Sequence, residues 1–420
     1  MKKDIITIIA IILAISLLSC KKEDENHPPQ IKVNAPLENS SLKAMDTVWV
    51  DCEVSDDDAN SITVSIYIVN AQMQIITQPY TQTNHSTYAH IQIPYDFSNR
   101  WLDSGIYYMV IQANDGNTSV KSYIKIYISA IPKKFCGLIT GIQNQQGCDV
   151  YVCDTSFVFS KILSLPSVIK GCCNPYEQSI EILLSSGTLE AYSFDYYQKL
   201  YTKNGLNKIG SPFYGDVAVK YPYTYVTDAN GNIFAIDENG IIRVSLATMF
   251  SPYRLLYWNE NWVTLSSQYP STHYWIEIPQ MIKNYQTSFD LSDIFPLDET
   301  HCLLVSQQNQ TVQFYSYKPE INYLITFGQS VSGVYNGGIF LNDELYVSIG
   351  NDLYAVDKIY GSVFSVFNGT ALSNLTWEEV HQQLYAFNQK NIYILSSSPM
   401  SIQRTFSFSG NVVFYDFIYK

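Results

Sequence analysis

The sequence is poor in charge, and poorest in positive charge. Charged residues make up 15% of the 420 residues, and 25 Lys and Arg stand against 38 Asp and Glu, which gives a formal net charge of −13. Proteins that bind nucleic acid through its backbone need Lys and Arg to neutralise phosphates. The charge balance therefore argues against that class, and we expect no nucleic-acid partner.

The sequence also lacks the short signatures of common enzymes. Its six His are scattered, and it has no Ser-nucleophile elbow, no His-Glu-x-x-His and no phosphate-binding Gly loop. The one acidic cluster with a His is Trp377-Glu378-Glu379 with His381, and some glycosidases use paired carboxylates of this kind. A place at a strand edge is the simpler interpretation, so we expect neither catalysis nor a cofactor.

Long apolar runs are scarce, and the longest lies at the N-terminus. Residues 5–18 are almost unbroken apolar sequence after a basic start, which is too short for a comfortable membrane span and is typical of a signal peptide. The run ends in Leu17-Leu18-Ser19-Cys20, which resembles a bacterial lipobox. The resemblance implies a signal peptide over residues 1–19 and lipid attachment at Cys20.

Residues 20–29 are predicted to form a tether. The run Lys21-Lys22-Glu23-Asp24-Glu25 resembles the export tag of some Gram-negative surface lipoproteins, although a solvated linker is an alternative interpretation. Two or three acyl chains anchor a protein stably where one is marginal. We therefore expect a lipid-anchored outer-membrane protein at the cell surface, with the membrane as one partner.

Alternating apolar and polar residues predict an all-β fold that begins with a small β-sandwich over residues 30–131. About seven strands in about 100 residues are typical of an immunoglobulin-like sandwich. Residues 54–58, 104–108 and 113–118 resemble turns of bacterial Ig-like or cadherin-like modules. This module would space the rest of the protein from the membrane.

The same module contains one candidate metal site. Asp56, Asp57 and Asp58, together with Asp115, could form a calcium site, because Ca²⁺ prefers several hard oxygen ligands. Turn formation is the alternative, since Asp accepts backbone N–H bonds and Asp-Gly favours tight turns. The sequence does not decide between the two, and we expect no other metal.

Residues 132–420 contain a recurring unit. Its copies are short alternating strands that start 38 to 44 residues apart, a period that indicates a β-propeller. Seven copies predict seven blades, and they lie at residues 150–154, 189–193, 233–237, 274–278, 312–316, 353–357 and 392–396. The first repeat is one strand short, so we expect residues 412–419 to complete it and close the ring.

Two of these copies, at residues 232–237 and 352–357, resemble repeats of quinoprotein-like and YVTN-type propellers. Quinoprotein enzymes of this kind carry a regularly placed Trp in each repeat. Here Trp258, Trp262 and Trp275 are irregularly placed. The resemblance therefore implies a propeller fold without a quinone cofactor.

Five of the eight Cys fall at the start of the propeller, and disulfides are the first interpretation in an exported protein. A hairpin centred between Gly141 and Cys148 would place Cys136 opposite Cys153, and Cys148 could then reach Cys172 or Cys173. A one-residue bulge would break this assignment. The spacings lack the Cys-x-x-Cys pattern of zinc sites.

The turns between second and third strands should cluster at one face of the ring. They are rich in amides, which suit a protein or glycan ligand, although Asn and Gln also simply make turns. The candidate ligand-face residues are Gln143, Asn144, Asp228, Asn230, Gln268, Tyr269, Gln307, Asn309, Asn351, Asn388 and Asn391.

The sequence thus predicts a lipid-anchored envelope protein that binds or scaffolds a protein or glycan. An enzyme acting on extracellular polysaccharide and a purely structural envelope component are the two alternatives.

Overall fold

The computed structural model describes residues 26–71, 73–97, 99–204, 215–228, 231–247, 252–258, 261–266, 272–277, 281–287, 289–298, 300–341, 344–397 and 399–420. The chain divides after Ile131 into two compact units, called unit 1 and unit 2 here. No helix in these ranges is long and apolar enough to cross a membrane. Cys20 and the apolar run of residues 5–18 lie outside the described residues.

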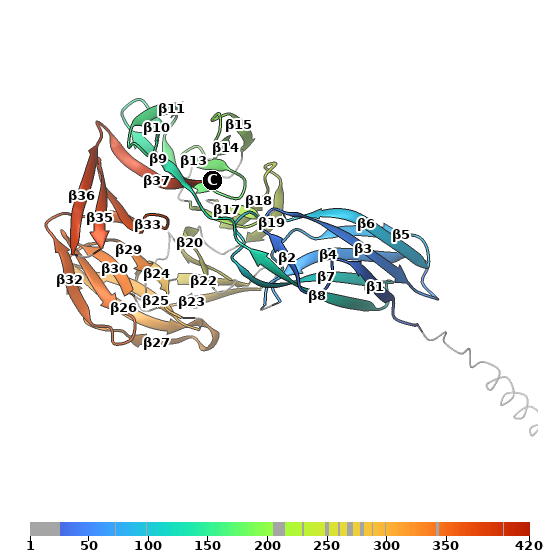
Figure 1. Cartoon of the computed structure of the whole chain (residues 1–420). Coiled ribbons are helices and arrows are strands. Elements are labelled where there is room, and N and C mark those ends of the chain that lie inside the picture. Colours follow the sequence, from blue (N-terminus) through green and yellow to red (C-terminus); the bar gives the residue numbers. More distant parts are fainter. Residues whose placement is uncertain are drawn as a thin grey trace, which may run out of the picture. The chain divides into compact units, whose positions relative to one another are not determined.

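Unit 1 consists of two β-sheets (Figure 1). The first has the order β1-β3-β6, and the second has the order β2-β8-β7-β4-β5 with β2 parallel to β8. The strands are β1 (Gln30–Ala35), β2 (Ser40–Lys43), β3 (Thr47–Ser55), β4 (Ile62–Val69), β5 (Tyr80–Asn84), β6 (Tyr88–Asp96), β7 (Gly105–Asn114) and β8 (Ser119–Ser129). The short strands β2 and β5 were not predicted from the sequence.

The two sheets of unit 1 share one hydrophobic core. Alternate residues of β3 are buried, among them Val50 and Cys52, and they pack with Ile66 of β4 and Ile111 of β7. A period of two places every second side chain on one face of a strand. The alternating pattern in the sequence therefore decides which face of each sheet is covered.

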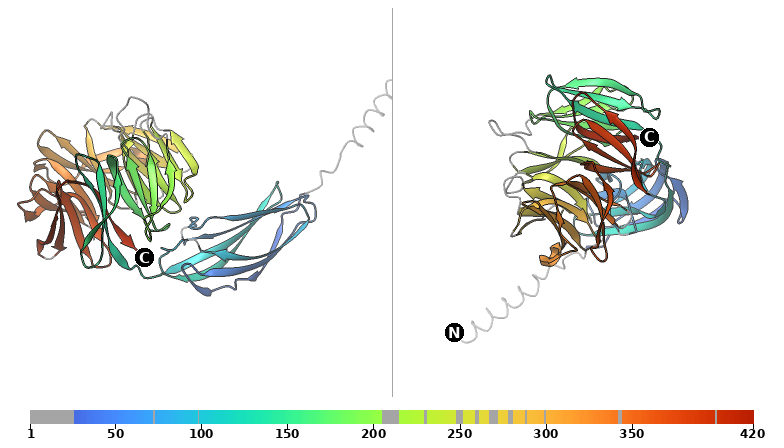
Figure 2. Two further views of the ribbon diagram at one scale, coloured as in Figure 1. Left: turned by 90° about the horizontal axis from the view of Figure 1, so that it is seen from above. Right: turned by 90° about the vertical axis from the view of Figure 1, so that its left-hand side faces the viewer.

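Within the described part of unit 2, the strands form seven sheets, each built around four antiparallel strands (Figures 1 and 2). The strands follow sequence order in six of the sheets, and the remaining sheet takes its innermost strand from the C-terminus. The first is β37-β9-β10-β11, with β9 (Phe135–Gln143), β10 (Cys148–Cys153), β11 (Phe159–Leu165) and β37 (Asn411–Tyr419). The next three are β12 (Val168–Asn174), β13 (Ser179–Leu184), β14 (Leu189–Ser193), β15 (Lys199–Lys203); β16 (Val217–Lys220), β17 (Tyr223–Thr227), β18 (Asn232–Ile236), β19 (Ile242–Ala247); and β20 (Pro252–Trp258), β21 (Asn261–Ser266), β22 (Thr272–Glu277), β23 (Met281–Gln286).

The last three sheets continue the same order. They are β24 (Leu291–Pro296), β25 (Cys302–Gln308), β26 (Thr311–Lys318), β27 (Tyr323–Thr326); β29 (Tyr335–Leu341), β30 (Glu344–Ile349), β31 (Asp352–Asp357), β32 (Val363–Asn368); and β33 (Ser373–Glu378), β34 (Gln383–Asn388), β35 (Asn391–Ser397), β36 (Met400–Ser407). A 3-10 turn, η1 (Pro319–Ile321), precedes β27, and the short β28 (Val331–Ser332) adds to β26.

The innermost strands of the seven sheets contact one another in series, starting from the C-terminal strand β37. β37 contacts β12, β12 contacts β16, and the series continues through β20, β24 and β29 to β33. Sheets that radiate from such a set of inner strands form a β-propeller. The structure therefore confirms the predicted propeller architecture of unit 2.

The repeated copies lie on the third strand of each sheet. Leu353 and Ala355 of β31 are fully buried, as are their counterparts Leu189 and Ala191 of β14. These apolar positions fill the space between neighbouring sheets. The repeat therefore encodes the packing of the ring and leaves the loops free to differ.

The C-terminal strand closes unit 2, as predicted. β37 pairs antiparallel with β9, and Thr140 Oγ1 donates to the carbonyl of Phe414 at 2.9 Å. The Phe414 ring fits between two glycines: a Cβ added at Gly141 would lie 2.2 Å from it, and one at Gly171 would lie 2.6 Å from it. Larger side chains at either glycine would displace the closing strand.

The described residues contain no disulfide, and the register predicted for Cys136 and Cys153 is wrong. The β9–β10 hairpin is centred one residue later than expected, so Cys153 faces Leu138 instead of Cys136. The reason is the turn: Asn144 Oδ1 accepts the N–H groups of Gln146 and Gly147, which lets β9 run on to Gln143. The seven cysteines in the described residues are free thiols, namely Cys52, Cys136, Cys148, Cys153, Cys172, Cys173 and Cys302. Burial raises the pKa of the Cys148 thiol to about 12.

Ring closure generates a testable prediction. Deleting residues 411–420 would leave the inner edge of β9 unpaired and remove Phe414 and Phe417 from two core clusters. Exposed strand edges aggregate, so we expect a misfolded or aggregating protein in size-exclusion chromatography and thermal melts. Tyr360→Ser, at a site that is 81% exposed, should leave the melting profile unchanged. A soluble deletion variant with the wild-type melting profile would refute the role of β37.

Candidate functional site

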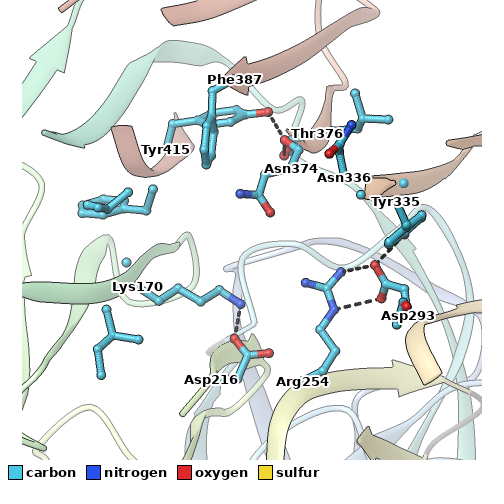
Figure 3. A pocket seen from close by; sticks show the side chains of 18 of the residues that line it. Lys170, Asp216, Arg254, Asp293, Tyr335, Asn336, Asn374, Thr376, Phe387 and Tyr415 are labelled. Carbon is cyan, nitrogen blue, oxygen red and sulfur yellow. Dashed lines mark hydrogen bonds and ion pairs between the residues drawn. The ribbon is translucent and has the colours of Figure 1, made fainter. Parts of the chain in front are cut away.

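A cavity of about 510 Å³ lies among the innermost strands of unit 2 (Figure 3). Its walls come from the first residues of β12, β24, β29, β33 and β37, from Arg254 of β20, and from Gly215 and Asp216 just before β16. All seven sheets therefore contribute to one site. Two charged pairs, two tyrosines and two asparagines face it.

The first charged pair joins Lys170 of β12 to Asp216. The Asp216 carboxylate is almost fully buried and also accepts the N–H of Val217 at 3.0 Å and that of Leu255 in β20 at 2.8 Å. The Asp216 backbone N–H donates to Thr227 Oγ1 at 2.9 Å. This aspartate therefore connects three neighbouring sheets, while the Lys170 side chain remains 35% exposed toward the cavity.

The second pair joins Arg254 of β20 to Asp293 of β24. The guanidinium contacts both carboxylate oxygens, with Nε–Oδ1 at 3.1 Å and Nη2–Oδ2 at 3.4 Å. Tyr335 of β29 donates its hydroxyl to Asp293 Oδ2 at 2.8 Å, and the Ile294 N–H donates to Oδ1 at 3.0 Å. Planar two-point contact of this kind fixes the orientation of an arginine.

A third aspartate, which does not line the cavity, uses the same arrangement. Asp416 of β37 accepts the N–H of Phe417 at 2.8 Å and that of Cys173 in β12 at 2.7 Å. Burial raises the pKa of Asp416, and these two hydrogen bonds act in the opposite direction. Asp216 and Asp416 thus each bind one N–H of their own chain segment and one of the next inner strand.

The remaining wall is polar and aromatic. The Asn374 amide points into the cavity, on the same side as the Lys170 and Arg254 head groups (Figure 3). Its backbone is left-handed, with φ of 45°, which Asn tolerates better than most residues. Tyr415 donates to the Asn374 carbonyl at 2.6 Å, so the start of β33 is held by the closing strand.

This arrangement is suited to binding rather than to hydrolysis. Both cavity aspartates already accept backbone N–H groups and pair with a cation, which leaves them little capacity as general acid or base. The ammonium, guanidinium and amide groups offer several donors at one place, and Tyr and Phe rings supply apolar faces. Such a surface fits a polar ligand with acceptor oxygens.

The turns between second and third strands, which were singled out in the sequence, lie at the same end of the ring as the cavity. In each sheet the innermost strand begins at the end where the antiparallel second strand ends. Two amides of these turns connect sheets: Gln143 Oε1 accepts the Val168 N–H at 3.4 Å, and Gln307 Oε1 accepts the Tyr335 N–H at 3.0 Å. Asp228 caps its own turn by accepting the Asn232 N–H at 2.8 Å.

The other loop residues are distributed as follows. Asn144, Asn309 and Asn351 are exposed in turns, and Asn388 accepts from Asn391 Nδ2 at 3.2 Å. Asn230, Gln268 and Tyr269 lie outside the described residues. The described members of this set do not line the cavity.

The acidic cluster near His381 makes internal contacts. The fully buried Glu378 carboxylate accepts the N–H groups of Val380 and His381, both at 2.8 Å, and the Tyr419 hydroxyl at 3.1 Å. It lies at the far end of β33 from Asn374 and holds the closing strand. Glu379 is exposed and pairs with Lys133.

Sequence reasoning missed the cavity residues themselves. Lys170, Asp216, Arg254 and Asp293 lie on or just before inner strands, where we expected packing residues. A signal was present: an Asp directly before an apolar strand residue recurs at Asp216, Asp293 and Asp416.

Comparison with known proteins does not assign the chain to a family. No family model and no curated protein matches the chain. Among solved structures, it is similar to the WD40 β-propeller domain of Doa1, with 9% identity and a TM-score of 0.47 over 61% of this chain and 90% of that one. It is also similar to the β-propeller domain of Myceliophteria thermophila Cps50 (Swd1), with 10% identity and a TM-score of 0.46 over 58% of this chain and 87% of that one.

Asp216→Asn tests the role of the first pair. The amide would turn an NH₂ group toward backbone N–H donors and leave Lys170 without its counter-charge. We expect the free energy of unfolding to fall by about 1–3 kcal/mol in urea titrations. Asp195→Asn is the control, because its pair with Lys420 is exposed and such pairs contribute about 0–1 kcal/mol. Equal effects of the two changes would contradict the bridging role.

Proposed function

We propose that this protein is a lipid-anchored cell-envelope protein whose propeller has seven blades and binds a polar protein segment or glycan without catalysis. The observation that carries the proposal is the cavity to which all seven sheets contribute. The seven sheets described in unit 2, six with four strands and one with a fifth short strand, support the blade number.

The chemistry of the cavity supports a ligand rich in oxygen acceptors. Lys170 and Arg254 are held in place by buried carboxylates but remain 35% and 37% exposed. Preorganised donors of this kind bind without a large loss of side-chain entropy. Carboxylates of acidic peptides and hydroxyls of sugars both present such acceptors.

Unit 1 fits the role of a spacer. Two sheets around one core support an immunoglobulin-like class for this unit. The lipobox-like sequence at Cys20 and the acidic run after it support a place at the outer membrane, facing outward. An anchored propeller held away from the membrane would present its cavity to partners outside the cell.

Ligand binding is tested with peptide and glycan arrays and a parallel assay for sugar turnover. We expect Arg254→Gln and Asn374→Gly to weaken binding of the captured ligand about tenfold or more, since a hydrogen bond to a charged group contributes about 1.5–3 kcal/mol. Glycine suits the left-handed backbone at Asn374. The matched control is Asn322→Gly, a left-handed Asn that follows η1, away from the cavity.

Three results would redirect the proposal. Binding that survives both cavity changes would place the ligand elsewhere on the ring. Sugar turnover that is lost in Glu378→Gln or Glu379→Gln would favour the polysaccharide-acting enzyme. Binding to neither ligand class would favour a purely structural envelope component.

The anchor is tested separately in cells. We expect the wild-type chain to incorporate labelled fatty acid and to fractionate with the outer membrane, and Cys20→Ser to do neither. Protease added to whole cells should digest the protein if it faces outward. Protection of the intact protein in whole cells, with digestion after lysis, would instead indicate the periplasmic leaflet.

A further inference from the structure

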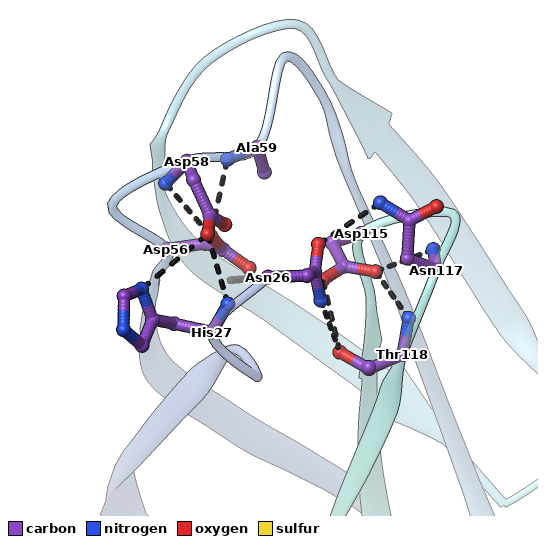
Figure 4. A network of polar contacts seen from close by, with 8 residues as sticks. All are labelled: Asn26, His27, Asp56, Asp58, Ala59, Asp115, Asn117 and Thr118. Carbon is purple, nitrogen blue, oxygen red and sulfur yellow. Dashed lines mark hydrogen bonds and ion pairs between the residues drawn. The ribbon is translucent and has the colours of Figure 1, made fainter. Parts of the chain in front are cut away.

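Three acidic side chains of unit 1 converge at one edge of its sheets (Figure 4). Asp56 and Asp58 lie in the loop after β3, and Asp115 lies in the turn between β7 and β8. One carboxylate oxygen from each lies within 4.8 Å of the others. Two loops that are distant in the sequence therefore bring three oxygen ligands to one point.

Asp56 supplies an independent sign of a missing ligand. The residue is only 4% exposed, and its Oδ1 accepts the N–H groups of Asp58 and Ala59, both at 3.1 Å. Its Oδ2 is buried and has no hydrogen-bond partner. A buried charged oxygen without a partner is costly, and turn formation explains only Oδ1. A cation among the three carboxylates would satisfy Oδ2.

The charge of the cluster favours a positive ligand. The three carboxylate groups lie close together, and like charges repel one another unless a cation lies between them.

The segment before β1 completes the surroundings of the cluster. The His27 N–H donates to Asp58 Oδ2 at 2.8 Å, and Asn26 Nδ2 donates to Asp115 Oδ2 at 3.1 Å. The Thr118 hydroxyl donates to the same Asp115 oxygen at 2.9 Å. The cluster thus connects the start of unit 1 to both loops (Figure 4).

We propose that Asp56, Asp58 and Asp115 bind one Ca²⁺ ion, which fixes the segment at Asn26 and His27 to the two loops of unit 1. Ca²⁺ takes six to eight oxygen ligands in flexible geometry, and carboxylates with backbone carbonyls and water are its usual set. Mg²⁺ demands stricter octahedral geometry, and Zn²⁺ prefers Cys and His ligands. This inference stands independently of the ligand of the propeller.

Calorimetric titration of the full chain in detergent, after treatment with EDTA, tests the proposal. We expect one CaCl₂ site per chain with a dissociation constant on the order of 10⁻⁴–10⁻³ M, as in extracellular modules. Millimolar CaCl₂ should also raise the melting temperature of unit 1, and EGTA should reverse that rise. MgCl₂ should bind at least tenfold more weakly.

Variants separate a cation site from turn formation. Asp56→Asn keeps an oxygen for the Asp58 and Ala59 N–H groups but removes the charge, so calcium affinity should fall at least tenfold. Asp115→Asn should lower the calcium affinity to a similar extent. Asp57→Asn, which changes an exposed neighbour of the cluster, should bind calcium as the wild type does. Absence of calcium binding in the wild type, equal affinity for Mg²⁺, or undiminished binding in both cluster variants would overturn the proposal.

Discussion

Pairing between β9 and β37 is the constraint on which unit 2 depends. It joins residues that are 274 positions apart in the hydrogen bond between Thr140 and Phe414. Around this pairing, Phe414 packs against two glycines, and the buried Glu378 accepts the Tyr419 hydroxyl. Among the described residues, the inner strands of the other six sheets make contact in chain order, from β12 to β33. The pairing of β37 with β9 therefore closes this row of sheets into a ring.

Under the proposed binding function, the polar groups around the centre of the ring would serve both stability and recognition. Asp216, Asp293 and Asp416 accept backbone N–H groups that would otherwise be buried without partners. Because two of these carboxylates also orient Lys170 and Arg254, the same atoms that hold the sheets together position the donors of the cavity. The proposed ligand would therefore meet donors that are already oriented.

The repeat period and strand alternation were sufficient to predict the propeller and its closing strand. They report directly on burial, as at Leu353 and Ala355. Pairing register was not predictable in the same way. Two extra strand residues, Ile142 and Gln143, moved Cys153 opposite Leu138, because the Asn144 side chain determines where the turn begins. The cavity residues were missed for a related reason. Their contacts cross between sheets, and a repeat within one sheet carries no information about them.

Closure by the last strand also orders events during synthesis. The β9 strand leaves the ribosome about 270 residues before its inner partner, an interval on the order of tens of seconds at about 5–20 residues per second. Throughout that interval the first sheet lacks β37, its innermost strand, and long-range pairing of this kind is slow to form. The nascent chain therefore carries an unpaired edge on β9 until β37 has been synthesised.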